Sequence, residues 1–154
     1  MAQEQKRGRA IAMSKDELDE FLTTEKTCRL ATVDAKGQPH VSPVWFVWDG
    51  EHMWINSLVR SQRWTDAMRH PLVGLTVDAG TEYFELRGVE ITGTIQVVGD
   101  VPRTDSGPDP LVQVAESGFG TKYSGGTYTP DGRHAWLKIT PTKIASWDFR
   151  KLPS

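Results

Sequence analysis

The sequence of 154 residues has one cysteine, Cys28, and no apolar run close to the roughly 20 residues that a membrane-spanning helix needs. A single cysteine excludes an internal disulfide and is typical of a reducing compartment, so we expect a cytoplasmic protein without membrane association. The first ten residues are polar and lack a following apolar segment, which is not the pattern of a secretory signal. A formal net charge of −2 provides no basic field for nucleic acid.

The common catalytic motifs are also absent. The chain has no His-Glu-x-x-His pair, no Gly-x-Ser-x-Gly turn, no Walker phosphate loop and no second cysteine. Its four histidines are scattered along the sequence without the spacing of metal ligands, so no metal site is predicted. No side chain is therefore assigned a catalytic role, and a protein of this kind would take its reactivity from an organic cofactor.

Hydrophobic periodicity indicates a mainly β protein of the α+β class. Ser14 and Glu17 form a capping box that starts a helix of about ten residues, and the apolar pattern predicts a second helix over 61–70. Alternating and β-branched segments predict strands over 28–33, 40–48, 53–57, 73–77, 83–98, 134–139 and 144–149. Strands in hairpin order with two to four short helices favour an antiparallel barrel.

Neither a shift in composition nor an internal repeat marks a second domain. We expect a flexible tail over residues 1–12 and a single domain over residues 13–150. Segments rich in glycine and proline predict a loop over 99–110 and a connection over 119–132, with one or two helical turns between them at 111–116.

The most informative segment is the polar corner that leads from the third predicted strand into the second predicted helix. Free backbone N–H groups at a helix start favour an anion, and hydroxyl and guanidinium groups add donors that suit phosphate oxygens. Arginine near a helix start is also often only solvated, so spacing alone leaves both interpretations open. The residues of this predicted phosphate site are Asn56, Ser57, Arg60, Ser61, Gln62 and Arg63.

A second segment contains Pro43 inside a predicted strand. Proline removes a donor from the strand ladder, so this strand is expected at a sheet edge or a bulge, with backbone groups free to meet a ligand. A flat heteroaromatic ring could bind there, and a plain hydrophobic strand is the alternative. Six tryptophans are more than the core of one small barrel accommodates, so some are expected at a dimer interface. The residues of this predicted ring site are Ser42, Pro43, Val44 and Trp45.

Together these motifs resemble the split β-barrel superfamily of pyridoxamine 5′-phosphate oxidase, and more narrowly its actinobacterial branch that depends on the deazaflavin coenzyme F420. The matching segments lie at 29–33, 37–46, 49–50, 57, 60–63, 70–71, 73–77 and 141–148. The resemblance implies a split β-barrel homodimer with cofactors at the subunit interface, where Trp147 could reach the partner's site. It places the cofactor phosphate on Ser57, Arg60, Ser61 and Arg63 and the ring along residues 42–45.

The activity that the resemblance implies is hydride transfer from reduced F420 to an activated small molecule with a C=C, C=N or quinone-type bond. An FMN-dependent oxidase or reductase is the alternative enzyme, because one phosphate site serves both cofactors. A flavin, deazaflavin or haem carrier is the alternative without turnover. F420 has an acidic tail that needs a basic groove, which Lys122, Arg133 and Arg103 could provide, and ordinary solvated loop charge is the other interpretation of these three residues.

Overall fold

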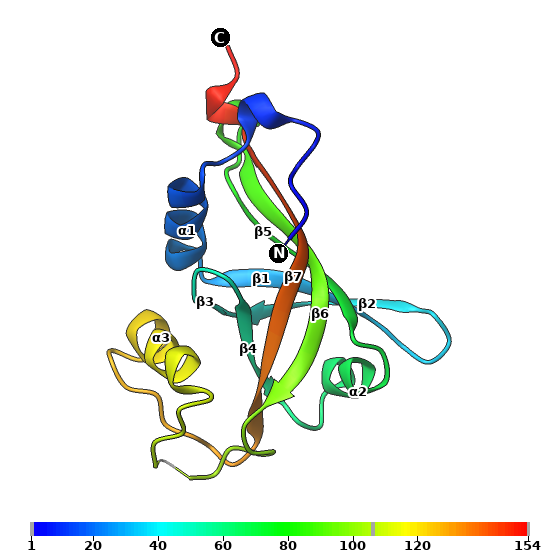
Figure 1. The fold of residues 1–154 in the computed structure, drawn as a ribbon, viewed down its shortest axis with the longest axis vertical. Helices are drawn as coiled ribbons and strands as arrows, with labels where there is room; N and C mark the ends of the chain where they lie inside the picture. Colours follow the sequence, from blue (N-terminus) through cyan, green and yellow to red (C-terminus); the bar gives the residue numbers. More distant parts are fainter. Residues whose placement is uncertain (1, 106, 154) are drawn as a thin grey trace.

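The computed structural model describes residues 2–105 and 107–153, and over these residues the chain forms one seven-stranded antiparallel sheet and three α-helices (Figure 1). The strand order in the sheet is β2-β1-β5-β6-β7-β4-β3. The helices are α1 (Lys15–Thr24), α2 (Gln62–Arg69) and α3 (Gln113–Tyr123). The strands are β1 (Thr27–Val33), β2 (Pro39–Trp45), β3 (Val47–Trp48), β4 (Met53–Leu58), β5 (Leu72–Ala79), β6 (Arg87–Val98) and β7 (His134–Asp148).

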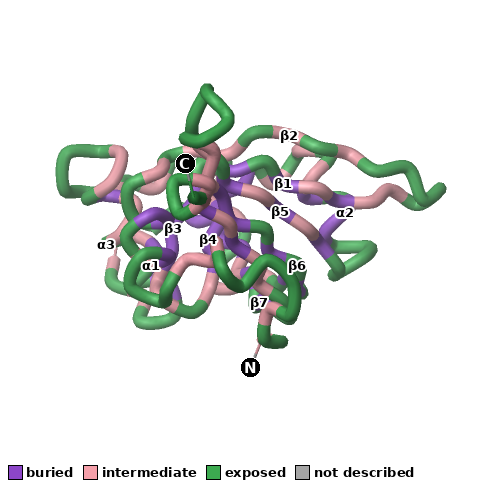
Figure 2. Tube along the Cα trace, turned by 90° about the horizontal axis from the view of Figure 1, so that it is seen from above, coloured by how far each residue is buried: buried purple, intermediate pink, exposed green. Residues whose placement is uncertain are grey.

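The sheet curls into a split β-barrel, which confirms the predicted fold class. The long strands β6 and β7 run together along the molecule, and β1 and β2 cross them (Figure 1). The concave side of the curl holds the core, to which β1, β4, β5, β6 and β7 contribute alternate side chains and α1 and α2 add apolar faces. Figure 2 shows the buried residues gathered in the centre and β2 exposed or intermediate along its length.

The first helix forms as its sequence predicts. The Ser14 hydroxyl accepts a hydrogen bond from the Glu17 amide, and the Glu17 carboxylate accepts one from the Ser14 amide, each at 3.2 Å. These two bonds satisfy donors that a helix start leaves free. Leu18, Phe21 and Leu22 then recur at helical spacing and are buried against the sheet. The sequence predicted both the cap and the buried face correctly.

The strand predicted over 40–48 is wrong in its extent, because the structure divides it at Phe46 into β2 and β3. The Phe46 amide donates to the Tyr123 hydroxyl at 3.0 Å, and the Phe46 carbonyl lies 2.8 Å from the same oxygen. A side chain from α3 thus occupies the backbone groups that a sheet neighbour would otherwise bond. Pro43 does lie on an edge strand, as predicted, since β2 ends the strand order.

Two further boundaries are corrected by the structure. The strands predicted over 134–139 and 144–149 are one strand, β7, which passes through Pro141 at a register shift opposite Gly93. A side chain at Gly93 would collide with the Thr140 carbonyl, so the bulge needs glycine there. The connection predicted from residue 119 is helical as far as Tyr123. In α3, Gly118 packs closely on Val47: a Cβ at position 118 would lie 2.5 Å from the Val47 side chain. This packing outweighs the low helix propensity of glycine.

The segment predicted as a flexible tail runs beside β7 in this structure. The Gln3 amide donates to the Thr142 carbonyl at 2.7 Å, and the Gln5 side chain bonds to the Ser146 backbone. A single 3-10 turn, Arg9–Ile11, then leads to α1. Two residues of the predicted segments, Met1 in the tail and Ser106 in the 99–110 loop, lie outside the described residues. Across the described part of the chain, no helix has the length and apolarity needed to cross a membrane.

Candidate functional site

The corner between β4 and α2 brings the hydroxyl groups of Ser57 and Ser61 close together. Ser61 is the N-cap of α2, where its hydroxyl accepts from the Trp64 amide at 3.1 Å and donates to the Leu58 carbonyl at 2.9 Å. Ser57 is fully buried near the end of β4, and its Oγ lies 3.4 Å from Ser61 Oγ. The cap therefore fixes the first turn of α2 directly above the Ser57 hydroxyl.

Arg63 in that first turn spans the opening between β4 and β2. Its Nη1 donates to Ser42 Oγ at 2.9 Å, and its Nε donates to Ser57 Oγ at 3.4 Å. Burial lowers the pKa of the guanidinium, and no carboxylate of the described chain forms an ion pair with it. A partly buried cation that is bonded only to hydroxyl groups leaves its charge uncompensated, which favours the binding of an anion.

Arg63 opens onto a cleft with a volume of about 670 Å³. This volume lies within the range of about 300–1,000 Å³ that is typical of sites for small molecules and cofactors. One wall consists of the predicted ring segment on β2, and the opposite wall comes from α3 and the segment that follows it. The lining residues are Pro43, Val44, Trp45, Asn56, Arg63, Phe119, Ser124, Thr127, Tyr128, Thr129, Asp131 and His134.

Aromatic side chains form the apolar part of the cleft. Trp45 is 52% exposed although it is a large apolar residue, and its other face stacks on Tyr123 with ring centroids 4.4 Å apart and an interplanar angle of 7°. Phe119 lies 6.0 Å from Trp45 and 5.5 Å from Tyr128, centroid to centroid. The Asn56 amide donates to the Tyr128 hydroxyl at 3.1 Å and joins the two walls. The exposed face of Trp45 can therefore pack against a planar ligand.

The structure brings most of the predicted site residues together. Ser42, Ser57, Ser61 and Arg63 are linked by hydrogen bonds or close oxygen contacts, and Pro43, Val44, Trp45 and Asn56 line the same cleft. Gln62 instead donates to the buried Asp66 at 2.7 Å. Arg60 is exposed at the corner.

Lys122 lies behind the cleft wall and not among the residues that line it. Its Nζ donates to the Leu22 carbonyl at 3.0 Å and lies 3.7 Å from the centroid of the Phe46 ring. Burial lowers the pKa of Lys122 to about 8. In this position the ammonium group supports the backbone turn at Phe46, next to Trp45.

Trp147 lies near the other end of β7 from His134, which does line the cleft. It pairs with Gly88 on β6 and packs so closely on that residue that a Cβ there would lie 2.5 Å from the indole ring. Any contact between Trp147 and a bound cofactor therefore depends on a second subunit.

The basic groove suggested by the loop charges is only partly formed. Arg103 is buried, with a side chain 4% exposed, and its Nε donates to Glu116 at 3.0 Å, so its charge is already paired. Arg133 is exposed and lies 3.6 Å from Asp131. Of the three residues, Arg133 alone has its guanidinium largely in solvent.

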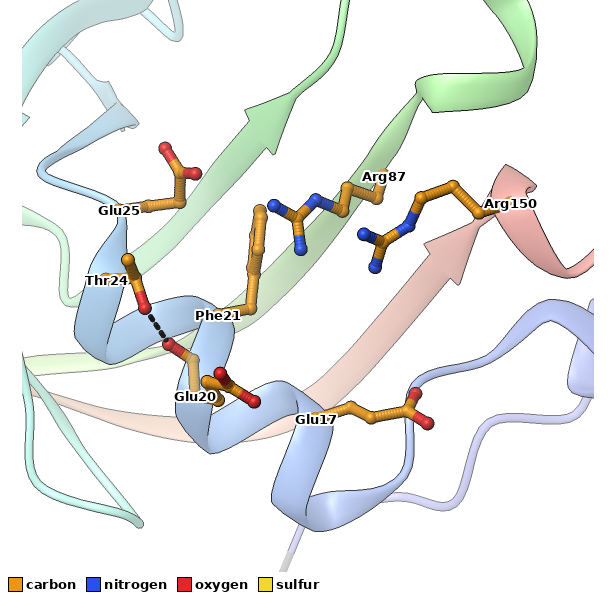
Figure 3. A pocket seen from close by; sticks show the side chains of 7 residues that line it. All are labelled: Glu17, Glu20, Phe21, Thr24, Glu25, Arg87 and Arg150. Carbon is orange, nitrogen blue, oxygen red and sulfur yellow. Dashed lines mark hydrogen bonds between the residues drawn. The ribbon is translucent and has the colours of Figure 1, made fainter.

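A second and smaller cleft, of about 260 Å³, lies between α1 and the far ends of β6 and β7 (Figure 3). Glu17, Glu20 and Glu25 face Arg87 and Arg150 across it, so the charges are of both signs. Glu17 accepts from Lys151 at 2.6 Å, and Arg150 is paired with Asp148 at 2.7 Å. Arg87 lies over the Phe21 ring, 5.1 Å from its centroid, and glutamates on the same cleft already supply negative charge near it.

Sequence reasoning missed the wall of the main cleft that follows α3. Asp131 and His134 line it, and the Asp131 carboxylate lies 2.6 Å from His134 Nδ1. Burial raises the pKa of Asp131, but hydrogen bonds from the Arg133 amide and from the His134 ring and amide outweigh this effect and hold it below its ordinary value. The tetrapeptide Asp-Gly-x-His, which the chain contains twice, could have predicted the Asp–His pair but not which copy lines the cleft.

The sequence of the chain matches a known protein family. The profile of the family described as pyridoxamine 5′-phosphate oxidase matches residues 14–148, which include every strand of the sheet. The chain belongs to this family. Ser42, Ser57 and Arg63 of this member of the pyridoxamine 5′-phosphate oxidase family lie inside the matched region. No curated protein gives a significant sequence match to it.

Several solved structures share the fold of this family member. A conserved hypothetical protein from Mycobacterium tuberculosis has a TM-score of 0.79 at 27% identity, with 97% of this chain and 95% of that chain covered. The haem storage protein HutZ from Vibrio cholerae has a TM-score of 0.67 at 19% identity, with coverages of 84% and 91%. An F420 reductase has a TM-score of 0.60 at 22% identity, with coverages of 82% and 94%. The last two likenesses show a common fold alone.

Proposed function

We propose that the cleft binds coenzyme F420 and that the protein is an F420-dependent reductase of an activated small molecule. The observation that carries this proposal is the environment of Arg63. Its guanidinium is partly buried, donates to Ser42 and Ser57, and lacks a carboxylate partner within the described chain. A phosphate would supply the missing negative charge, and the serine hydroxyls would hold the guanidinium in place for it.

The position of the ring follows from β2. As an edge strand it has backbone groups that no neighbouring strand uses, and Val44 and Trp45 line the cleft beside Arg63. The exposed face of Trp45, held by its stack on Tyr123, gives a planar ring an apolar surface. Phe119 and Tyr128, which line the same cleft, would help to exclude water from it.

The chain's own residues bind and orient, and the cofactor provides the redox chemistry. When bound, reduced F420 supplies a hydride to a substrate with an activated C=C, C=N or quinone-type bond. Arg63 and the two serines would fix the distance between the phosphate and the ring, which sets where the substrate must lie. The fold of an F420 reductase is similar to that of this chain, so the scaffold is compatible with this choice of cofactor.

A homodimer with its cofactor sites at the subunit interface is part of the same proposal. Trp147 packs on Gly88 far from the Arg63 end of the cleft, so any contribution to a cofactor site must come from a second copy of the chain. Light scattering at micromolar concentration tests this arrangement. A particle of 17.2 kDa would contradict it.

The choice of cofactor is tested by titrating the protein with F420, FMN and haem in separate experiments, followed by absorbance and by tryptophan fluorescence. We expect F420 to bind with a micromolar or lower dissociation constant and to quench Trp45, and FMN to bind more weakly. Tighter binding of FMN would show that the cleft prefers a flavin to F420. Binding of haem alone would favour a carrier, and binding of none of the three would overturn the proposal.

A further inference from the structure

His134 and Asp131 form an oriented pair at the cleft wall opposite Trp45. The Asp131 Oδ1 accepts from the amides of Arg133 and His134 at 2.8 and 3.1 Å, which fixes the carboxylate. Its Oδ2 lies 2.6 Å from His134 Nδ1. An ionised carboxylate can only accept, so Nδ1 carries a proton in this contact and Nε2 is the nitrogen left for a ligand.

The strand register directs the ring of His134 toward the cleft. His134 is the first residue of β7 and lies directly opposite Leu58 on β4. Cross-strand partners share a face of the sheet, and so do residues two apart on one strand. His134, Leu58 and Asn56 are therefore on the same face, which is the one that Asn56 presents to the cleft. The His134 side chain is 25% exposed, so a ligand can reach it.

We propose that His134 in its doubly protonated form, oriented by Asp131, is the general acid of this cleft, an inference that rests on the proposed reductase function. As hydride arrives at one substrate atom, the π bond breaks and its electron pair moves to the conjugated atom. The His134 Nε2–H bond then breaks, and the proton forms a bond to that atom. The imidazole left behind keeps Nδ1–H on Asp131 and takes its next proton from water.

A test of this proposal must distinguish His134 from the other charged and proton-donating groups of the cleft. Asp131 and Arg63 are the charged residues that line the cleft with it, and Arg133 is its neighbour in sequence. Tyr128 is the competing proton donor, because its hydroxyl also lines the cleft. Burial raises the pKa of Tyr128, which makes the phenol a weaker acid near neutral pH than an imidazolium group.

The primary test compares His134→Gln with His52→Gln, both loaded with F420. His52 is a matched control because it forms the same kind of pair, with Asp49, at 27% side-chain exposure and outside the residues that line the cleft. We expect His134→Gln to lower kcat about 100-fold. We also expect its dissociation constant for F420 to be unchanged, so that the loss appears in kcat and not in cofactor binding. His52→Gln should retain the wild-type kcat.

Asp131→Asn tests the positioning residue by a readout that does not need turnover. Without the carboxylate that holds its Nδ1–H, the His134 ring should lose its fixed tautomer. In the protein without cofactor, nitrogen NMR of the His134 ring should show Nδ1 protonated in wild type and a mixture of tautomers in Asp131→Asn. The His52 ring should give the same signals in both proteins.

The outcomes distinguish this inference from the proposed function. A wild type that does not bind F420 overturns both. A wild type that binds F420 and turns over, but keeps its kcat in His134→Gln, overturns the proton donor alone. A loss of kcat in Tyr128→Phe but not in His134→Gln would assign the proton to the phenol and contradict the proposal. An unchanged His134 tautomer in Asp131→Asn would contradict the role of Asp131.

Discussion

The tetrapeptide Asp-Gly-x-His occurs at 49–52 and at 131–134, and both copies fold into the same local structure. In each, the aspartate Oδ1 accepts from the amides two and three residues further on, and Oδ2 contacts the histidine Nδ1. In each, the glycine has a positive φ, 98° at Gly50 and 71° at Gly132. The motif thus makes the turn, wherever it occurs.

The two copies differ in what surrounds them. Asp49 lies in the β3–β4 hairpin, where Oδ2 also accepts from the Trp54 indole at 2.8 Å, and its side chain is 11% exposed. The Asp131 side chain is 35% exposed and lines the main cleft with His134. The first carboxylate is committed to holding a hairpin against a core tryptophan. The second holds a histidine whose other nitrogen is available to a ligand. The motif therefore has a structural role at 49–52 and, in our proposal, a role in proton transfer at 131–134.

The largest expected difference between the two turns is in the free energy of unfolding of their Asp→Asn variants. Asp49→Asn replaces one of the two carboxylate oxygens by an N–H₂ group, which cannot accept a hydrogen bond. Either the Glu51 and His52 amides at Oδ1 or the Trp54 indole at Oδ2 then lose their acceptor. We expect a loss of about 2–3 kcal/mol in the free energy of unfolding. Asp131→Asn should cost less than about 1 kcal/mol, because its carboxylate is partly solvated. Urea denaturation of both variants measures the difference, and equal losses would erase the distinction between the two turns.

Substitution of the glycine should also destabilise the first turn more than the second, by a smaller amount than substitution of the aspartate. A side chain at φ 98° lies outside the left-handed region, whereas φ 71° lies at its edge. We expect Gly50→Ala to cost about 2 kcal/mol and Gly132→Ala about 1 kcal/mol. Thermal unfolding of the two variants checks this, and a greater loss in Gly132→Ala would contradict the backbone account.

The smallest effect is in the response to acid. Burial raises the pKa of Asp49, but hydrogen bonds from the Trp54 indole and from the Glu51 and His52 amides hold it below its ordinary value, and hydrogen bonds lower the pKa of Asp131 likewise. A carboxylate with a lowered pKa contributes stability above its unfolded pKa of about 4, and this is lost as pH falls through the folded value. The free energy of unfolding should therefore fall less steeply below pH 4 in either Asp→Asn variant. A slope equal to that of wild type would contradict this.

The sequence predicted those parts of the molecule that short-range chemistry decides. The capping box at Ser14, the edge position of Pro43 and the polar corner at Ser57 and Arg63 all depend on neighbours within a few residues. The contact between Arg63 and Ser42 could be expected only from the family resemblance, because it joins segments 21 residues apart that the curl of the sheet brings together.

What the sequence did not predict depends on packing between distant segments. Gly120 lies in the connection predicted over 119–132, but α3 continues to Tyr123, and Gly118 in this helix packs on Val47 of β3. The division of β2 from β3 requires the Tyr123 hydroxyl, which lies 77 residues from Phe46. The wall formed by Tyr128, Asp131 and His134 has no periodicity, so only the folded chain shows that it faces Arg63.

The most direct test of the central claim is the dissociation constant of F420 for wild type, Arg63→Ala and Arg69→Ala. Arg69 is the matched control, since it is an exposed arginine at the other end of α2. Loss of a charge-assisted phosphate contact should cost about 1.5–3 kcal/mol in Arg63→Ala, which weakens binding roughly 10- to 150-fold. Arg69→Ala should bind as wild type does. If Arg63→Ala bound F420 as tightly as wild type while remaining folded, the cleft would not hold the phosphate at Arg63, and the account would be wrong.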